Sequence, residues 1–203
     1  PPMAEEVAAP TVAAPAAAID LGLGVSASFK VALEVSAPKV DITPMIRVHK
    51  VPEPDLEVIL FLGRHCSLSY LDLWNARVKF GSWQLVMDKY RISPVVIFPP
   101  FETDPGPPYG NAWGYWRNKG KGGNAWGLDK KGNPLPWKDD DILSCIRVQH
   151  TCSYTGKKPN VVVSDFKVHK SWEALSGHER NEKAKKQGKG AAADKGASPT
   201  TRV

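Results

Sequence analysis

Proline and glycine interrupt the apolar stretches of this chain throughout its length. Its 203 residues include 18 prolines and 17 glycines, and both residue types are unfavourable inside helices. The apolar stretches between them are only about five to nine residues long, which is close to the usual length of a β-strand. We therefore expect a chain of short strands and loops.

Two stretches show the expected strand patterns most clearly. In Ser28–Val35, apolar side chains alternate with Lys30 and Glu34, which is the period of a half-buried strand. Leu56–Leu62 is almost entirely apolar and suits a central strand that is covered on both faces. Further strand patterns occur at Met45–Val51, Ser67–Leu73, Ala76–Phe80, Ser82–Asp88, Pro94–Phe98, Ile142–Gln149 and Asn160–Val168.

These segments predict an all-β or β-dominated fold, with a single antiparallel sandwich or barrel-like domain over residues 27–175. Residues 1–26 are rich in alanine and proline, and we expect them to form an extended arm. Residues 176–203 are predicted to be a basic, low-complexity tail.

The predicted domain also contains local turn and helix signals near its end. Thr155–Pro159 predicts the turn of a hairpin. Ser171 is expected to cap a short helical turn at Trp172–Leu175. Residues 178–187 can extend that helix, whereas the glycines that begin at Gly188 are expected to end it.

Residues 99–138, the Trp/Gly segment, have neither a strand period nor a helix period. They contain the repeat Gly110-Asn-Ala-Trp-Gly114 and Gly123-Asn-Ala-Trp-Gly127, and four of the seven tryptophans. Long loops without structure are uncommon inside a domain, and disordered segments are poor in aromatic residues. We therefore expect this segment to pack against other parts of the protein or against a partner.

The positive charge of the chain lies outside the predicted strands. The net charge of the whole chain is +6. Residues 27–104 and 139–175 are each neutral, residues 1–26 carry −3, residues 105–138 carry +5 and residues 176–203 carry +4. A basic surplus in a loop and a tail is typical of a protein that binds a polyanion.

Side chains that could support catalysis or bind a metal are scattered along the sequence. The three cysteines, Cys66, Cys145 and Cys152, suit a reducing compartment better than a disulfide scaffold. Together with His65 and His150 they offer a zinc site or a Cys–His pair only if the fold gathers them. The sequence has no CxxC pair, no nucleophile elbow and no phosphate-binding glycine motif. We predict a non-enzymatic protein with no metal site and no cofactor.

Aromatic rings interleaved with basic residues are suited to single-stranded nucleic acid, because rings stack on bases while cations follow the phosphates. The same rings could instead stack on sugars or anchor to protein, and these alternatives stay open. Lysines in the tail can add phosphate contacts that depend on salt but not on sequence. The predicted contact residues are Trp113, Tyr115, Trp116, Arg117, Lys119, Lys121, Trp126, Lys130, Lys131, Lys183, Lys185, Lys186 and Lys189.

Together these features predict a structural or RNA-binding component of a large ribonucleoprotein assembly, such as a mitochondrial ribosome. We expect RNA and neighbouring proteins as partners, no transmembrane segment, and an intracellular location in the mitochondrial matrix. The alternatives are an accessory subunit of a mitochondrial membrane complex and a carbohydrate-binding β-sandwich. Leu62-Gly63-Arg64, followed by Trp74, resembles the start of a picornavirus-like capsid jelly roll, which implies a capsid protein as a further alternative.

Overall fold

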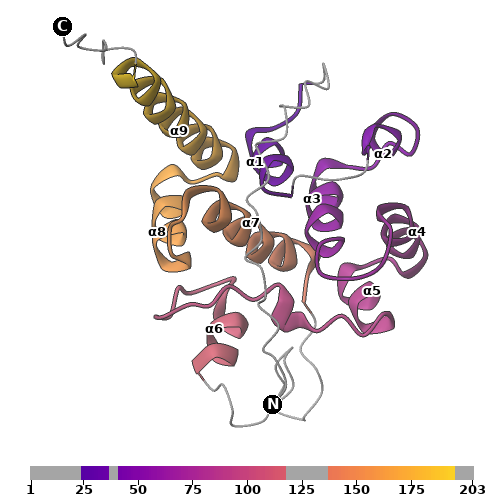
Figure 1. The fold of residues 1–203 in the computed structure, drawn as a ribbon. Coiled ribbons are helices and arrows are strands. Elements are labelled where there is room, and N and C mark those ends of the chain that lie inside the picture. The colour runs from indigo at the N-terminus through magenta and orange to yellow at the C-terminus, as the bar shows by residue number, and fades with distance from the viewer. Residues whose placement is uncertain (1–23, 37–40, 118–136, 195–203) are drawn as a thin grey trace, which may run out of the picture.

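A computed structural model of the protein describes residues 24–36, 41–117 and 137–194, and every regular element in these ranges is a helix (Figure 1). The elements are α1 (Ala27–Ser36), α2 (Thr43–Arg47), α3 (Glu53–Leu62), α4 (Tyr70–Phe80), α5 (Trp83–Lys89), the 3-10 turn η1 (Pro94–Val96), α6 (Gly110–Arg117), α7 (Asp139–Thr155), α8 (Pro159–His169) and α9 (Trp172–Asp194). The predicted β-dominated sandwich or barrel is therefore wrong. The jelly-roll capsid and the carbohydrate-binding β-sandwich lose their structural basis with it.

Every segment with a strand pattern coincides with a helix or overlaps one. Ser28–Val35 lies in α1, Met45–Val51 overlaps α2, Leu56–Leu62 lies in α3, Ser67–Leu73 and Ala76–Phe80 fall on α4, Ser82–Asp88 on α5, Pro94–Phe98 on η1, Ile142–Gln149 in α7 and Asn160–Val168 in α8. A short apolar stretch can be buried equally well as a strand or as part of a helix, so its length and composition alone do not decide between the two.

The prolines begin helices here and do not separate strands. Pro44, Pro54, Pro94 and Pro159 each occupy one of the first two positions of a helix or helical turn. At these positions the missing N–H of proline has no partner to lose, and the fixed φ of the ring already suits a helix. The prolines that we interpreted as helix breakers are therefore compatible with a helical chain, because they stand where helices begin.

Small residues explain why the apolar alternation in α1 was misleading. The helix buries Phe29 and Leu33 together with Ala32, Ser28 and Ser36. These residues are spaced by three or four positions and form one helical stripe. Because alanine and serine carry no strong apolar signal, the alternation of the larger side chains dominated the sequence pattern.

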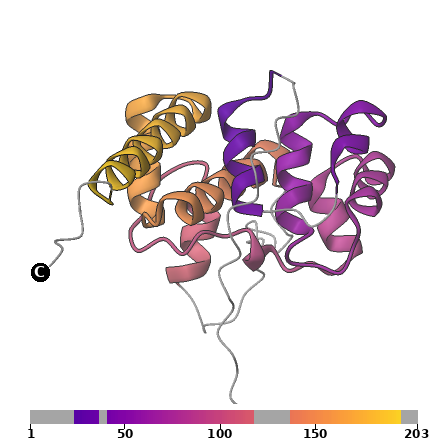
Figure 2. The same ribbon diagram turned by 45° about the horizontal axis from the view of Figure 1, so that its top comes forward.

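Helix α7 lies at the centre of the molecule and packs against α1, α3 and α8 (Figures 1 and 2). Its buried face includes Leu143, Ile146 and Val148. Residues 56–62 of α3 are all buried, which explains their almost continuous apolar sequence. Helix α9 packs on α1 and α8 through its first part, and its C-terminal end extends beyond the other helices in Figure 1.

The Trp/Gly segment was predicted to have no helix, but its first repeat lies in α6. Tyr109 is buried in the hydrophobic core, and its ring lies 5.4 Å from that of Phe101 in the same segment. Trp137 is buried and stacks on Phe98 at 5.0 Å. The expectation that the segment packs against other parts of the protein is confirmed at these residues, and residues 118–136 lie outside the described structure.

The local signals near the end of the chain were interpreted more accurately. Thr155–Pro159 contains the turn as predicted, although it joins two helices and not two strands. Ser171 caps α9, since its hydroxyl accepts a hydrogen bond from the backbone N–H of Ala174 at 3.1 Å. The predicted end of this helix before Gly188 is wrong, because α9 continues to Asp194. None of the helices in the described ranges is long and apolar enough to cross a membrane.

Candidate functional site

The predicted contact residues fall into two groups that the fold keeps apart. Trp113, Tyr115, Trp116 and Arg117 belong to α6, and Lys183, Lys185, Lys186 and Lys189 belong to α9. Figure 1 shows α8 between these two helices. The other predicted residues, Lys119, Lys121, Trp126, Lys130 and Lys131, lie outside the described residues.

Trp113 supports a structural role for the beginning of the Trp/Gly segment. Its side chain is half-buried and packs against the hydrophobic core. It follows Ala112, which is fully buried. Within α6, Trp113 therefore behaves as an anchor to the core, which was one of the alternatives for this segment.

Two lysines of α9, Lys183 and Lys186, line a small groove between the end of α7 and α9. This α7–α9 groove has a volume of about 270 Å³. The ammonium group of Lys183 lies over the ring of Tyr154, 3.8 Å from its centroid. The groove is lined by Tyr154, Thr155, Lys157, Glu179, Glu182, Lys183 and Lys186.

The two carboxylates that line the groove, those of Glu179 and Glu182, each form an ion pair with a lysine. Lys157 donates hydrogen bonds to Glu179 at 2.6 Å and to Asp165 at 2.8 Å. Lys185 donates one to Glu182 at 2.8 Å. Burial tends to lower the pKa of Lys157, but its two carboxylate partners raise it overall, so this lysine stays charged.

Lys183 and Lys186 are placed differently from the other lysines around the groove. Among the described residues, neither has a carboxylate within 4.0 Å of its ammonium group. They are three positions apart, so they lie on the same side of α9. The pair presents two cations at the edge of a groove whose two carboxylates each form an ion pair with another lysine.

Tyr154 is the residue of this groove that the sequence analysis missed. Its segment was interpreted as a strand ending at Gln149, followed by a hairpin turn. Burial, and then Glu179, raise the pKa of the Tyr154 hydroxyl, so the side chain is neutral near pH 7. No local sequence signal pairs this ring with Lys183, because the two are 29 positions apart and meet only through the packing of α7 beside α9.

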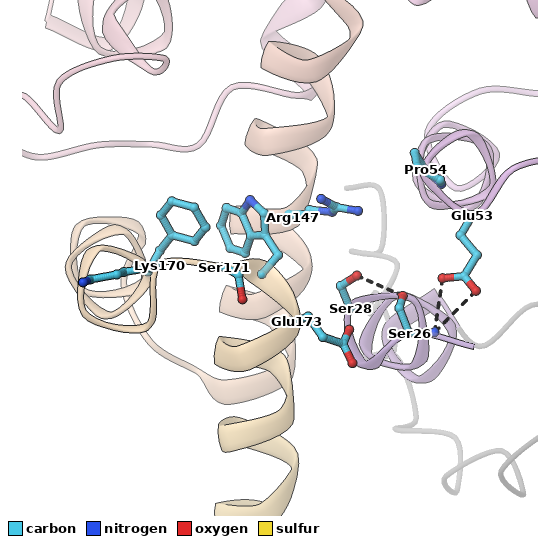
Figure 3. Close-up of a pocket in the computed structure, with 10 residues that line it drawn as sticks. Ser26, Ser28, Glu53, Pro54, Arg147, Lys170, Ser171 and Glu173 are labelled. Carbon is cyan, nitrogen blue, oxygen red and sulfur yellow. Dashed lines mark hydrogen bonds between the residues drawn. The ribbon is translucent and has the colours of Figure 1, made fainter. Parts of the chain in front are cut away.

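A larger cavity of about 490 Å³ lies where the beginnings of α1, α3 and α9 meet α7 (Figure 3). Figure 3 shows Arg147 reaching from α7 toward α1 and α3, while Lys170 points away from Ser28 and Glu53. The cavity is lined by Ser26, Ser28, Glu53, Pro54, Arg147, Phe166, Lys170, Ser171, Trp172 and Glu173.

The polar groups of this cavity hold helices together. Arg147 donates to both carboxylate oxygens of Glu57, at 2.7 and 2.8 Å, and Ser28 donates to one of them at 3.2 Å. Glu53 and Glu173 accept hydrogen bonds from the backbone N–H groups of Ser26 and Ala27, at the start of α1. These contacts join four helices, so the cavity is a structural junction.

The cysteine and histidine residues considered for metal binding or catalysis are not gathered into a site. No group of three or more metal-ligating side chains occurs within the part of the chain that the structure describes. Burial raises the pKa of the Cys145 thiol strongly and that of Cys152 to about 11. Both thiols are therefore protonated at neutral pH, and a thiol in that state is a weak nucleophile.

Comparisons of this chain with protein-family models, with curated proteins and with solved structures find no match.

Proposed function

We propose that this protein is a non-enzymatic, RNA-binding component of a large ribonucleoprotein assembly, of the kind that a mitochondrial ribosome represents. It contacts the phosphate backbone through Lys183 and Lys186 of α9. The observation that carries this proposal is the pair Lys183 and Lys186, which lines the α7–α9 groove and has no carboxylate within 4.0 Å of its ammonium groups among the described residues.

The distribution of charge in the fold supports the same proposal. Many basic side chains of the helical body are held in ion pairs, as in Arg77–Asp55, Arg147–Glu57 and Lys158–Glu102. Residues 176–203 carry a net charge of +4. Residues 176–194, which belong to α9, carry +2 of this charge. A basic surplus of this kind attracts a polyanion by releasing its counterions.

A filter-binding titration against single-stranded RNA at several salt concentrations tests this function. Changing both Lys183 and Lys186 to glutamine removes two phosphate contacts. The slope of log affinity against log salt concentration should fall by about 1.4, since each contact to a single strand contributes about 0.7. The matched control changes Lys79 and Lys89 to glutamine. These lysines are exposed on α4 and α5, so the control removes the same charge from another part of the surface. An unchanged slope in the α9 variant would contradict the proposal.

A further inference from the structure

The ring of Tyr154 offers a contact that phosphate binding alone does not use. It lies in the α7–α9 groove, whose volume of about 270 Å³ is slightly smaller than that of the usual pocket for a drug-sized molecule. Such a space suits one flat group of the size of a nucleobase. The ring is half-buried, so α7 holds it in place while part of it stays accessible.

Lys183 is the group that covers this ring in the free protein, with its ammonium 3.8 Å from the ring centroid. A lysine side chain is flexible, and an arriving phosphate attracts its ammonium more directly than the aromatic ring does. When Lys183 turns to the phosphate, the face of the Tyr154 ring becomes available. A base stacked on that ring offsets the loss of the cation–π contact that it replaces.

The remaining groups of the groove are consistent with this exchange. Lys186 is one helical turn from Lys183 and can contact the neighbouring phosphate of the strand. Glu179 and Glu182 would repel phosphates if they were unpaired, but each forms an ion pair with a lysine, Glu179 with Lys157 and Glu182 with Lys185. The groove therefore combines one aromatic face with two cations that have no carboxylate within 4.0 Å among the described residues.

We propose that the α7–α9 groove holds one nucleotide of single-stranded RNA, with its base stacked on Tyr154 and its phosphates contacted by Lys183 and Lys186. This inference rests on the proposed function and specifies its substrate. In a duplex the bases are stacked on one another and paired, so none is free to enter the groove. The protein accordingly prefers a single strand to a duplex of the same sequence.

Fluorescence anisotropy with the full-length protein tests this preference. The probes are a labelled single-stranded RNA of mixed sequence and the duplex that it forms with its complement. Tyr154→Leu removes the flat ring but keeps an apolar side chain in the half-buried position. It should weaken binding of the single strand by about five- to a hundredfold and leave binding of the duplex unchanged. Tyr154→Phe keeps the ring and should bind both probes like the parent.

Failure of this inference differs from failure of the proposed function. One outcome would refute this inference alone. In it, Tyr154→Leu weakens the binding of both probes equally or of neither, while the double variant of Lys183 and Lys186 lowers the salt slope. In that case α9 binds phosphate but the groove holds no base. If the double variant leaves the slope unchanged, both proposals are wrong. Thermal unfolding of each variant identifies any loss of binding that comes from a loss of the fold.

Discussion

Replacing His150 with leucine should make the protein more resistant to mild acid. His150 lies on α7 with 2% of its surface exposed, and its ring packs edge-on against Phe61. Neither of its ring nitrogens has a hydrogen-bond partner among the described residues. Burial, and then the nearby charges of Arg64, Arg147 and His65, lower the pKa of this imidazole to about 3.

The size of the effect follows from the difference between the folded and unfolded pKa values. The unfolded pKa of histidine is near 6.5, so between pH 6.5 and about 3 the unfolded chain binds a proton at His150 that the folded protein does not. The stabilisation from keeping this group neutral is complete above pH 6.5 and is lost as the pH falls toward 3. Between pH 7.5 and pH 5 the loss amounts to about 2 kcal/mol. This is a substantial part of the 5–15 kcal/mol that is typical of a domain.

Leucine at position 150 binds no proton in either the folded or the unfolded state. The variant therefore does not lose this stability as the pH falls. The substitution also removes a buried polar group that has no partner, and this should raise the free energy of unfolding by about 1 kcal/mol at every pH. The free energy of unfolding of the variant should therefore exceed that of the parent by about 1 kcal/mol near pH 7.5 and by about 3 kcal/mol near pH 5. Urea unfolding, followed by tryptophan fluorescence at both pH values, measures these differences.

Two other histidines help to interpret the measurement. His49 is exposed, and its change to glutamine controls for the loss of an imidazole as such. His65 is partly buried, and burial followed by the charge of Arg64 lowers its pKa as well, so its removal should shift the acid response in the same direction. A stability difference between His150→Leu and the parent that is the same at both pH values would refute the reasoning.

Two further changes test the packing of the helices. Arg147→Met leaves the carboxylate of Glu57, whose side chain is 1% exposed, without its cation, and should cost about 3–5 kcal/mol in urea unfolding. Combining it with Glu57→Leu should restore much of that stability, and additive losses in the double-mutant cycle would contradict the pairing. Gly156→Ala and Gly177→Ala place the same methyl group in open space but should act in opposite directions. The first should lower the free energy of unfolding by about 1 kcal/mol because φ is +73° at Gly156, whereas the second should raise it by about the same amount because Gly177 lies inside α9. Equal effects in thermal unfolding would refute this explanation.

The sequence predicted burial better than it predicted the type of element. Leu56–Leu62 was expected to be covered on both faces, and α3 does bury all seven of these residues. It was expected to be a strand because short apolar stretches bounded by proline are typical of strands. Pro54 in fact occupies an early position of the helix, where proline is favourable.

The candidate site was predicted in part from composition. The charge of residues 176–203 pointed to Lys183 and Lys186, and their helix was correctly expected over residues 178–187. The aromatic partner was expected among the tryptophans of the Trp/Gly segment. The structure instead places Tyr154 beside Lys183, and Trp113 packs against the core.

The sequence by itself determined that residues 56–62 of this protein are buried, where its charges lie and that the chain turns at Thr155–Pro159. These properties depend on single side chains and on local chemistry, as the hydroxyl cap of Ser171 and the left-handed glycine at position 156 show. Only the tertiary structure decided between helix and strand, because burial of apolar surface is non-directional and favours either for a short segment. It also decided that the end of α7 lies beside α9, since the contact between Tyr154 and Lys183 depends on how two helices pack and not on the residues next to either one.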